Sequence, residues 1–150
     1  MHKSALPAVV YALQRFWAGD SQGAAYTLAP RIETLVREMF RSVEHGIYML
    51  QQTHKPGQFP GLDAMLDLLP TPYEVSPSRQ RFLTTALTNP IGLNVRNRLA
   101  HEVNEYGDAG TAALLIHIAL SLTMLRPRRK SSDDSSTVTP TPPDDATTTN

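Results

Sequence analysis

Apolar side chains recur every three or four residues through most of this chain, and this spacing is the strongest constraint on its fold. The longest example lies between residues 21 and 44, at Ala25, Leu28, Ile32, Leu35, Val36, Met39, Phe40 and Val43. An α-helix turns about 100° per residue, so these positions share one face that favours burial. No segment shows the sustained alternation of a β-strand. We therefore expect an all-α fold, a compact bundle of about five to six helices.

Proline, glycine and capping residues indicate where the other helices begin and end. They predict helices near residues 4–18, 62–69, 76–89, 94–103 and 108–126, with a loop over 47–60. Pro30 is expected to kink or split the 21–44 helix, because proline has no amide N–H and clashes with the preceding turn. We expect the aromatic side chains of Phe16, Trp17 and Phe40 to lie in the core rather than to stack on bases.

Length and composition divide the chain into one domain and a tail. The 150 residues, 41% of them apolar, suffice for a single core, and we place the helical domain at residues 1–125. Residues 126–150 begin with a basic cluster and continue in Ser, Thr, Pro and Asp. Such a segment buries too little apolar surface to offset its ordering entropy, so we expect it to be disordered. Its basic cluster is interpreted as a solvated helix end, with an RNA contact as the alternative.

Charge and residue types exclude several functional classes. The 14 basic and 14 acidic residues give zero net charge, which argues against a nucleic-acid binder that relies on a broad basic surface. The absence of cysteine excludes disulfides and thiolate metal sites, and the histidines lack metal-binding spacing, so we expect no metal and no cofactor. The longest apolar run, residues 112–125, is too short to span a bilayer, and the N-terminus lacks a signal sequence. A cytoplasmic protein without a membrane partner is expected.

One segment, residues 92–102, combines side chains that bind phosphate with a side chain that transfers protons, a combination that the rest of the chain lacks. It reads GLNVRNRLAHE and places Arg96, Asn97 and His101 around the start of an amphipathic helix. A guanidinium group binds phosphate through paired N–H donors, and an imidazole exchanges a proton near neutral pH. We therefore take Arg96, Asn97 and His101 as the candidate catalytic residues.

Helix geometry predicts where these side chains point. Leu99 belongs to the stripe of the helix that faces the core, and His101 lies about 200° from it, turned away from the core. Asn97 is four residues before His101 and shares its face. Arg96 is five residues before His101, roughly 140° away. These two converge only if Arg96 lies in the first turn or the preceding loop, and Asn94 is expected to cap the helix there.

An arginine followed after four to six residues by a histidine, at the head of a helix in a compact all-α domain, resembles the HEPN superfamily of nucleotide-binding helical domains. The wording GLNVRNRLAHE is similar to a subset found at the C-terminal end of larger bacterial proteins of unknown function. The upstream segment Pro30-Arg31-Ile32-Glu33, with Arg37 four residues later, fits the same subset. The resemblance covers roughly residues 20 to 125.

Two positions depart from the family pattern. Glu102 stands where the subset has glycine after the histidine. One HEPN branch is regulated by nucleotidylation of a tyrosine two residues beyond the histidine, but here that position is Val103, and Tyr106 is out of register. That form of regulation is therefore not expected.

The resemblance implies a metal-independent endoribonuclease of a toxin–antitoxin or antiviral defence type. RNA would be cleaved by attack of its 2′-hydroxyl on the adjacent phosphate, in a composite cleft between the two protomers of a homodimer. His101 would act as general base or acid, Arg96 would hold the phosphate, and Asn97 would bind a phosphate oxygen or orient the histidine. An antitoxin or a sensor protein is a further expected partner. The alternatives are a non-catalytic HEPN-like RNA-binding or dimerisation module and a structural domain that binds proteins.

The same residues also have ordinary structural interpretations. Arg96 can form a salt bridge with Glu33 or Glu102, while Asn97 and His101 can be a polar surface pair. Glu33 and Arg37 have the spacing of an ion pair that supports a helix. His117 flanks the apolar stripe of the last helix and is expected at an edge or an interface.

Overall fold

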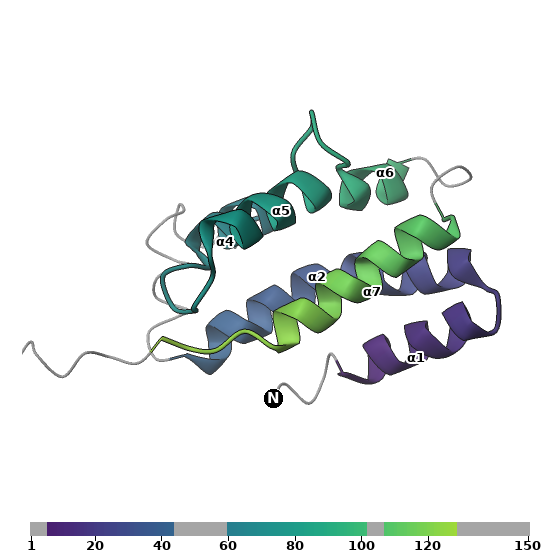
Figure 1. Ribbon diagram of the computed structural model, residues 1–150, viewed down its shortest axis with the longest axis horizontal. Helices are drawn as coiled ribbons and strands as arrows, with labels where there is room; N and C mark the ends of the chain where they lie inside the picture. The colour runs from purple at the N-terminus through teal and green to yellow at the C-terminus, as the bar shows by residue number, and fades with distance from the viewer. Residues whose placement is uncertain (1–5, 44–59, 102–106, 129–150) are drawn as a thin grey trace, which may run out of the picture.

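The computed structural model describes residues 6–43, 60–101 and 107–128, and within them the all-α prediction is confirmed. These residues form six helices and no strand (Figure 1). The helices are α1 (Leu6–Trp17), α2 (Ser21–Ser42), α4 (Leu62–Leu68), α5 (Pro77–Leu87), α6 (Val95–His101) and α7 (Ala109–Thr123).

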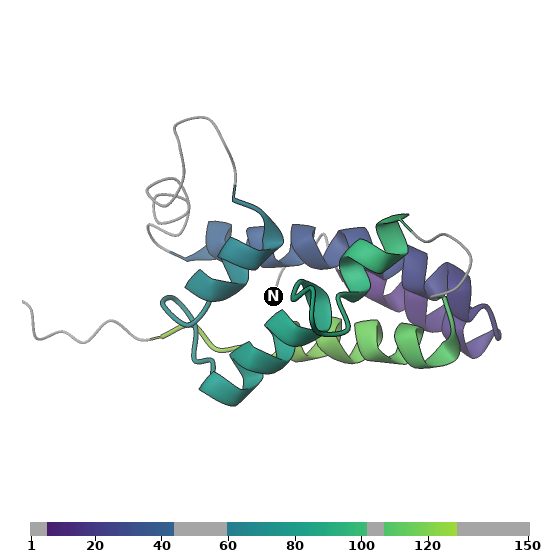
Figure 2. The ribbon, with the colours of Figure 1, turned by 90° about the horizontal axis from the view of Figure 1, so that it is seen from above.

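The long helix α2 connects the two halves of the bundle. It packs against α1 and α7 along one side and against α4 and α6 on another. Figures 1 and 2 show α4, α5 and α6 lying across α2 and α7, on the side away from α1. Because α6 lies directly on α2, any site on α6 is shaped by both helices.

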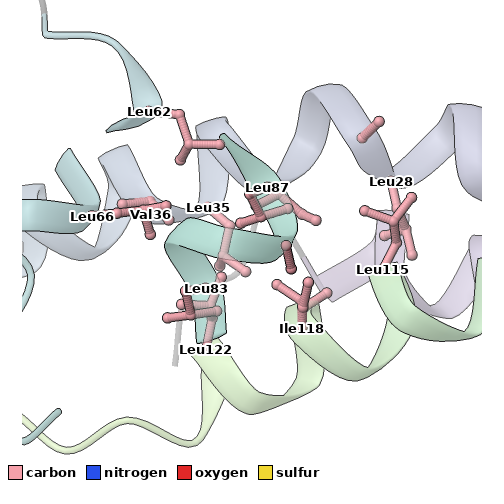
Figure 3. Packing of buried hydrophobic residues seen from close by; sticks show 14 of the residues in the cluster. Leu28, Leu35, Val36, Leu62, Leu66, Leu83, Leu87, Leu115, Ile118 and Leu122 are labelled. Atoms are coloured by element: carbon pink, nitrogen blue, oxygen red, sulfur yellow. The ribbon is translucent and has the colours of Figure 1, made fainter. Parts of the chain in front are cut away.

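The core is continuous across these contacts, as Figure 3 shows. Most of its largest fully buried side chains come from α2, α4, α5 and α7, and they include Leu28, Leu66, Leu87, Leu115 and Ile118. No polar or charged residue of the described part of the chain is buried. The candidate residues are therefore held by helices with an apolar core rather than by a buried polar network.

A kink or a split was predicted at Pro30, and the split is wrong, because helix α2 continues through Pro30 as a single element. Pro30 itself is exposed, whereas Leu28 and Ala29 before it and Ile32 after it are buried. Burial on both sides of the proline stabilises the helix enough to offset the missing amide N–H. Because Pro30 is exposed, its ring is accessible beside α6.

The prediction that all three aromatic residues lie in the core is wrong for Trp17. Phe40 is fully buried and Phe16 packs against the core, but Trp17 is 79% exposed. Helix α1 faces the core with Val9 and Ala12, and Phe16, four residues after Ala12, continues that face. Trp17 is turned about 100° further around the helix, towards solvent.

The ordered part of the chain extends past the predicted boundary at residue 125. The amide of Glu74 donates to the carbonyl of Arg126 (2.9 Å), and the amide of Arg128 donates to the carbonyl of Pro72 (2.9 Å). Arg128 Nε also donates to the carbonyl of Pro70 at 2.8 Å. The prediction of disorder is therefore wrong for residues 126–128, which backbone pairing holds; residues 129–150 lie outside the described residues.

Aspartate side chains cap the two longest helices. Asp20 accepts the amide N–H of Gly23 (2.8 Å) at the start of α2, a cap that was not predicted. Asp108 accepts that of Thr111 (2.7 Å) at the start of α7, as predicted. The Gly23 amide and then the Arg15 guanidinium hold the pKa of the Asp20 carboxyl below its ordinary value. The Thr111 amide and hydroxyl do the same for the pKa of Asp108.

These two caps predict a loss of stability in acid. Each carboxyl has a lower pKa in the folded chain than in the unfolded chain, where it is about 3.9. The stabilisation is present above that value and is lost as the pH falls through the lower, folded pKa. In an Asp20→Asn, Asp108→Asn variant, the melting temperature between pH 6 and pH 2 should fall less steeply than in the wild type. Parallel melting curves for the two proteins would contradict this assignment.

Candidate functional site

A left-handed residue sets the start of α6. Asn94 has φ of 47°, and its carbonyl accepts the amides of Asn97 (3.1 Å) and Arg98 (3.0 Å). The predicted side-chain cap is wrong, because Asn94 Oδ1 is buried with no hydrogen-bond partner among the described residues. Asparagine tolerates this backbone conformation better than most residues. The turn is tied to α5 by the amide of Leu93, which donates to the carbonyl of Thr85 at 3.0 Å.

The predicted orientation of α6 is confirmed for the core-facing Leu99 and for His101. Val95 and Leu99 are buried, whereas His101 is exposed at the last residue of the helix. Arg96 lies in the first turn, where the spacing required it to lie if it was to approach His101. Glu102, Val103 and Tyr106, on which the family comparison also depended, lie outside the described residues.

Arg96 is held in place by two contacts. Its Nη2 lies 3.0 Å from Glu33 Oε2, and its Nη1 donates to Asn97 Oδ1 at 3.0 Å. The other oxygen of Glu33 accepts from Arg37 Nη2 at 2.9 Å. Both ion pairs expected from the sequence are thus confirmed, and one carboxylate lies between two guanidinium groups. Together these three side chains carry a net charge of +1.

Helices α2 and α6 enclose a groove of about 640 Å³ that contains both Arg96 and His101. From α6 it is lined by Arg96, Leu99, Ala100 and His101, and from α2 by Tyr26, Ala29, Pro30, Glu33, Thr34 and Arg37. Asn97 is not part of this lining. The structure thus brings two of the three predicted site residues, Arg96 and His101, into one groove, while the third, Asn97, only accepts a hydrogen bond from Arg96.

The apolar part of the groove was not predicted from the sequence. Tyr26, Pro30, Glu33 and Arg37 follow one another at intervals of four, three and four residues, so they lie on one face of α2. The spacing indicates a shared helix face from the sequence alone. Only the packing of α6 against α2 shows that this face lines a groove. Arg31, which belongs to the motif suggested by resemblance, instead lies beside Val9 and Ala119.

A second cavity, of about 290 Å³, lies between the ends of α2 and α7. It is lined mainly by apolar side chains, together with the hydroxyls of Ser42 and Tyr73. Tyr73 Oη donates to the carbonyl of Met39 at 2.9 Å and lies 3.0 Å from Ser42 Oγ. None of the described residues that line this cavity carries a charge. A phosphate would therefore be bound far better in the groove between α2 and α6.

The part of the chain that the structure describes holds neither a cluster of metal ligands nor a membrane-spanning helix. Within it, no three His, Asp or Glu side chains gather closely enough to hold a metal ion. None of its helices is both long and apolar enough to cross a membrane.

Comparisons with family models, with curated proteins and with solved structures find no match to this chain.

Proposed function

We propose that the groove between α2 and α6 binds the phosphodiester backbone of RNA and cleaves it without a metal ion, as an endoribonuclease of the HEPN type. The observation that carries this proposal is that Arg96 and His101 line one groove although they are five residues apart on a short helix. A phosphate-binding group and a proton-transfer group thereby reach the same space.

The charges in the groove support capture of an anion. Among the described residues that line the groove, the two guanidinium groups of Arg37 and Arg96 outnumber the one carboxylate, that of Glu33. Arg96 has five N–H donors, of which one goes to Asn97 and one to Glu33 among the described residues. The remaining donors can bind phosphate oxygens. An exposed ion pair of this kind contributes at most about 1 kcal/mol, so phosphate can compete with Glu33.

The reaction needs a base, an acid and stabilisation of charge on phosphorus. The base takes the proton of the 2′-hydroxyl, whose oxygen attacks the adjacent phosphorus. The bond from phosphorus to the 5′-oxygen then breaks, and that oxygen takes a proton from the acid. His101 fills one of these roles, and a second copy of His101 across a homodimer cleft fills the other. Arg96 stabilises the charge that develops on the phosphoryl oxygens. The products are a 2′,3′-cyclic phosphate and a free 5′-hydroxyl.

The biological setting follows from the HEPN resemblance. Catalytic members serve toxin–antitoxin or antiviral systems, and we propose the same setting here, in the cytoplasm, with an antitoxin or sensor protein as partner. A non-catalytic RNA-binding or dimerisation module is the second candidate. The ion pair between Arg96 and Glu33 favours it, because that pair gives Arg96 a structural role without any substrate.

The proposal predicts RNA cleavage that survives EDTA and depends on the 2′-hydroxyl. Purified protein should cut a labelled RNA in EDTA, leave DNA of the same sequence intact, and give products with cyclic phosphate ends by mass spectrometry. RNA binding without cleavage would favour the non-catalytic module. Cleavage of DNA, or cleavage abolished by EDTA, would contradict the mechanism. A strictly monomeric mass in solution would contradict the composite cleft.

A further inference from the structure

We infer that the apolar end of the groove is a subsite for one unpaired nucleobase of the bound RNA, with Tyr26 as its stacking platform. This inference rests on the proposal that the groove binds RNA. It goes further by assigning a base-binding subsite next to the phosphate site.

The groove changes character along α2. Towards the end that begins at Ser21, its wall consists of Tyr26, Ala29 and Pro30, whereas further along the helix it consists of Glu33 and Arg37. An apolar wall and a charged wall therefore lie end to end on one helix face. A nucleotide changes in the same way along its length, from an anionic phosphate through the ribose to a flat base with apolar faces.

The direction in which α6 runs places His101, the proposed proton-transfer residue, between the charged wall and the apolar wall. Arg96, in the first turn of α6, contacts Glu33. From there α6 runs towards the end of α2 that begins at Ser21, as Figures 1 and 2 show together. Its last residue, His101, is about 7.5 Å further along the helix axis and thus lies towards the apolar wall. A phosphate at Arg96 would leave the ribose near His101 and the base near Tyr26.

Energetics and size favour a base over another occupant. Stacking of a base on an aromatic side chain contributes about 1–3 kcal/mol, and it requires a base that is not already stacked in a duplex. The volume of about 640 Å³ lies within the range of small-molecule sites, roughly 300–1,000 Å³. An apolar helix from another protein would bring no group to match the excess positive charge of the groove. A nucleotide matches both the charge and the apolar wall.

Binding of a fluorescent single-stranded RNA, measured by anisotropy in EDTA, tests this subsite. All proteins carry His101→Ala so that the RNA stays intact. Tyr26→Leu should weaken binding by about 5- to 150-fold, the factor equivalent to one lost stacking contact. Tyr26→Phe, which keeps the ring, should bind almost as the parent does. Tyr11→Leu is the matched control, because Tyr11 is a half-exposed tyrosine on α1 that does not line the groove.

A second RNA separates stacking from a change in fold. An oligonucleotide with abasic sites should bind weakly to all four proteins and show no dependence on Tyr26. Equal binding of the base-containing RNA by the parent and Tyr26→Leu, or equal loss in Tyr26→Leu and Tyr11→Leu, would overturn the inference, as would the absence of any RNA binding. Cleavage by the protein that retains His101 is scored separately. Its absence would overturn the enzyme but not a Tyr26-dependent RNA site.

Discussion

Replacing His101 by alanine is expected to lower the rate of RNA cleavage by at least about 100-fold. General acid–base groups contribute factors of roughly 10²–10⁴, and His101 is the histidine that lines the groove beside Arg96. The change should leave RNA binding largely intact, because the guanidinium of Arg96 remains. It should also leave the melting temperature unchanged, since His101 is exposed at the end of α6 and its removal uncovers no core surface.

The chain offers a matched histidine for this measurement. His117 is exposed on α7, where its ring lies 6.1 Å from the ring of Phe82, and it does not line the groove. His117→Ala should therefore retain wild-type cleavage. Both variants are purified identically and assayed in EDTA on one labelled RNA. Equal cleavage by His101→Ala and the wild type would show that the activity belongs to another residue or to a copurifying nuclease.

The helices were predictable because their signals are local. The sequence predicted the second helix over residues 21–44, and α2 spans Ser21–Ser42. Ser76 and Asp108 were expected to begin helices, and both accept an amide N–H at a helix start. Helix caps and the spacing of buried residues depend on neighbours within a few positions, so the local sequence is enough to predict where a helix forms.

Features that depend on distant packing were not predictable in the same way. Residues 126–128 pair with 72–74, which lie more than fifty positions earlier in the chain. The exposure of Trp17 depends on which face of α1 contacts α2 and α7, because Phe16 and Trp17 are equally apolar neighbours. Asn94 was recognised as a helix-start residue, but its left-handed backbone follows from the way the turn is tied to Thr85.

The candidate site shows the same division. Its α6 half was predicted, since a helix of known start fixes the directions of Arg96 and His101. The α2 half was only partly foreseen: Glu33 was one of two expected partners for Arg96, and Tyr26 was not considered. The packing of α2 against α6 is what brings Glu33 to Arg96. A motif thus predicts the reactive groups, whereas tertiary packing determines the surface that a substrate would meet.

The second large effect is expected on stability. Phe40→Ala should lower the free energy of unfolding by about 3–5 kcal/mol, because Phe40 is fully buried on α2 and its truncation loses apolar burial and leaves a cavity. α2 packs against α1, α4, α6 and α7, so the surrounding helices cannot close the cavity without disturbing one another. Chemical denaturation followed by circular dichroism measures this change.

Trp17→Ala is the matched aromatic truncation. Trp17 is 79% exposed and contacts Phe16 edge to face at 5.7 Å, so its loss should cost no more than about 1 kcal/mol. Circular dichroism is the required signal, because Trp17 is the sole tryptophan of the chain and fluorescence would disappear with it. If Trp17→Ala proved as costly as Phe40→Ala, α1 would have to bury Trp17 against the bundle, and the packing of α1 described above would be wrong. A large difference between the two variants requires instead that Phe40, on α2, lies at the centre of the core.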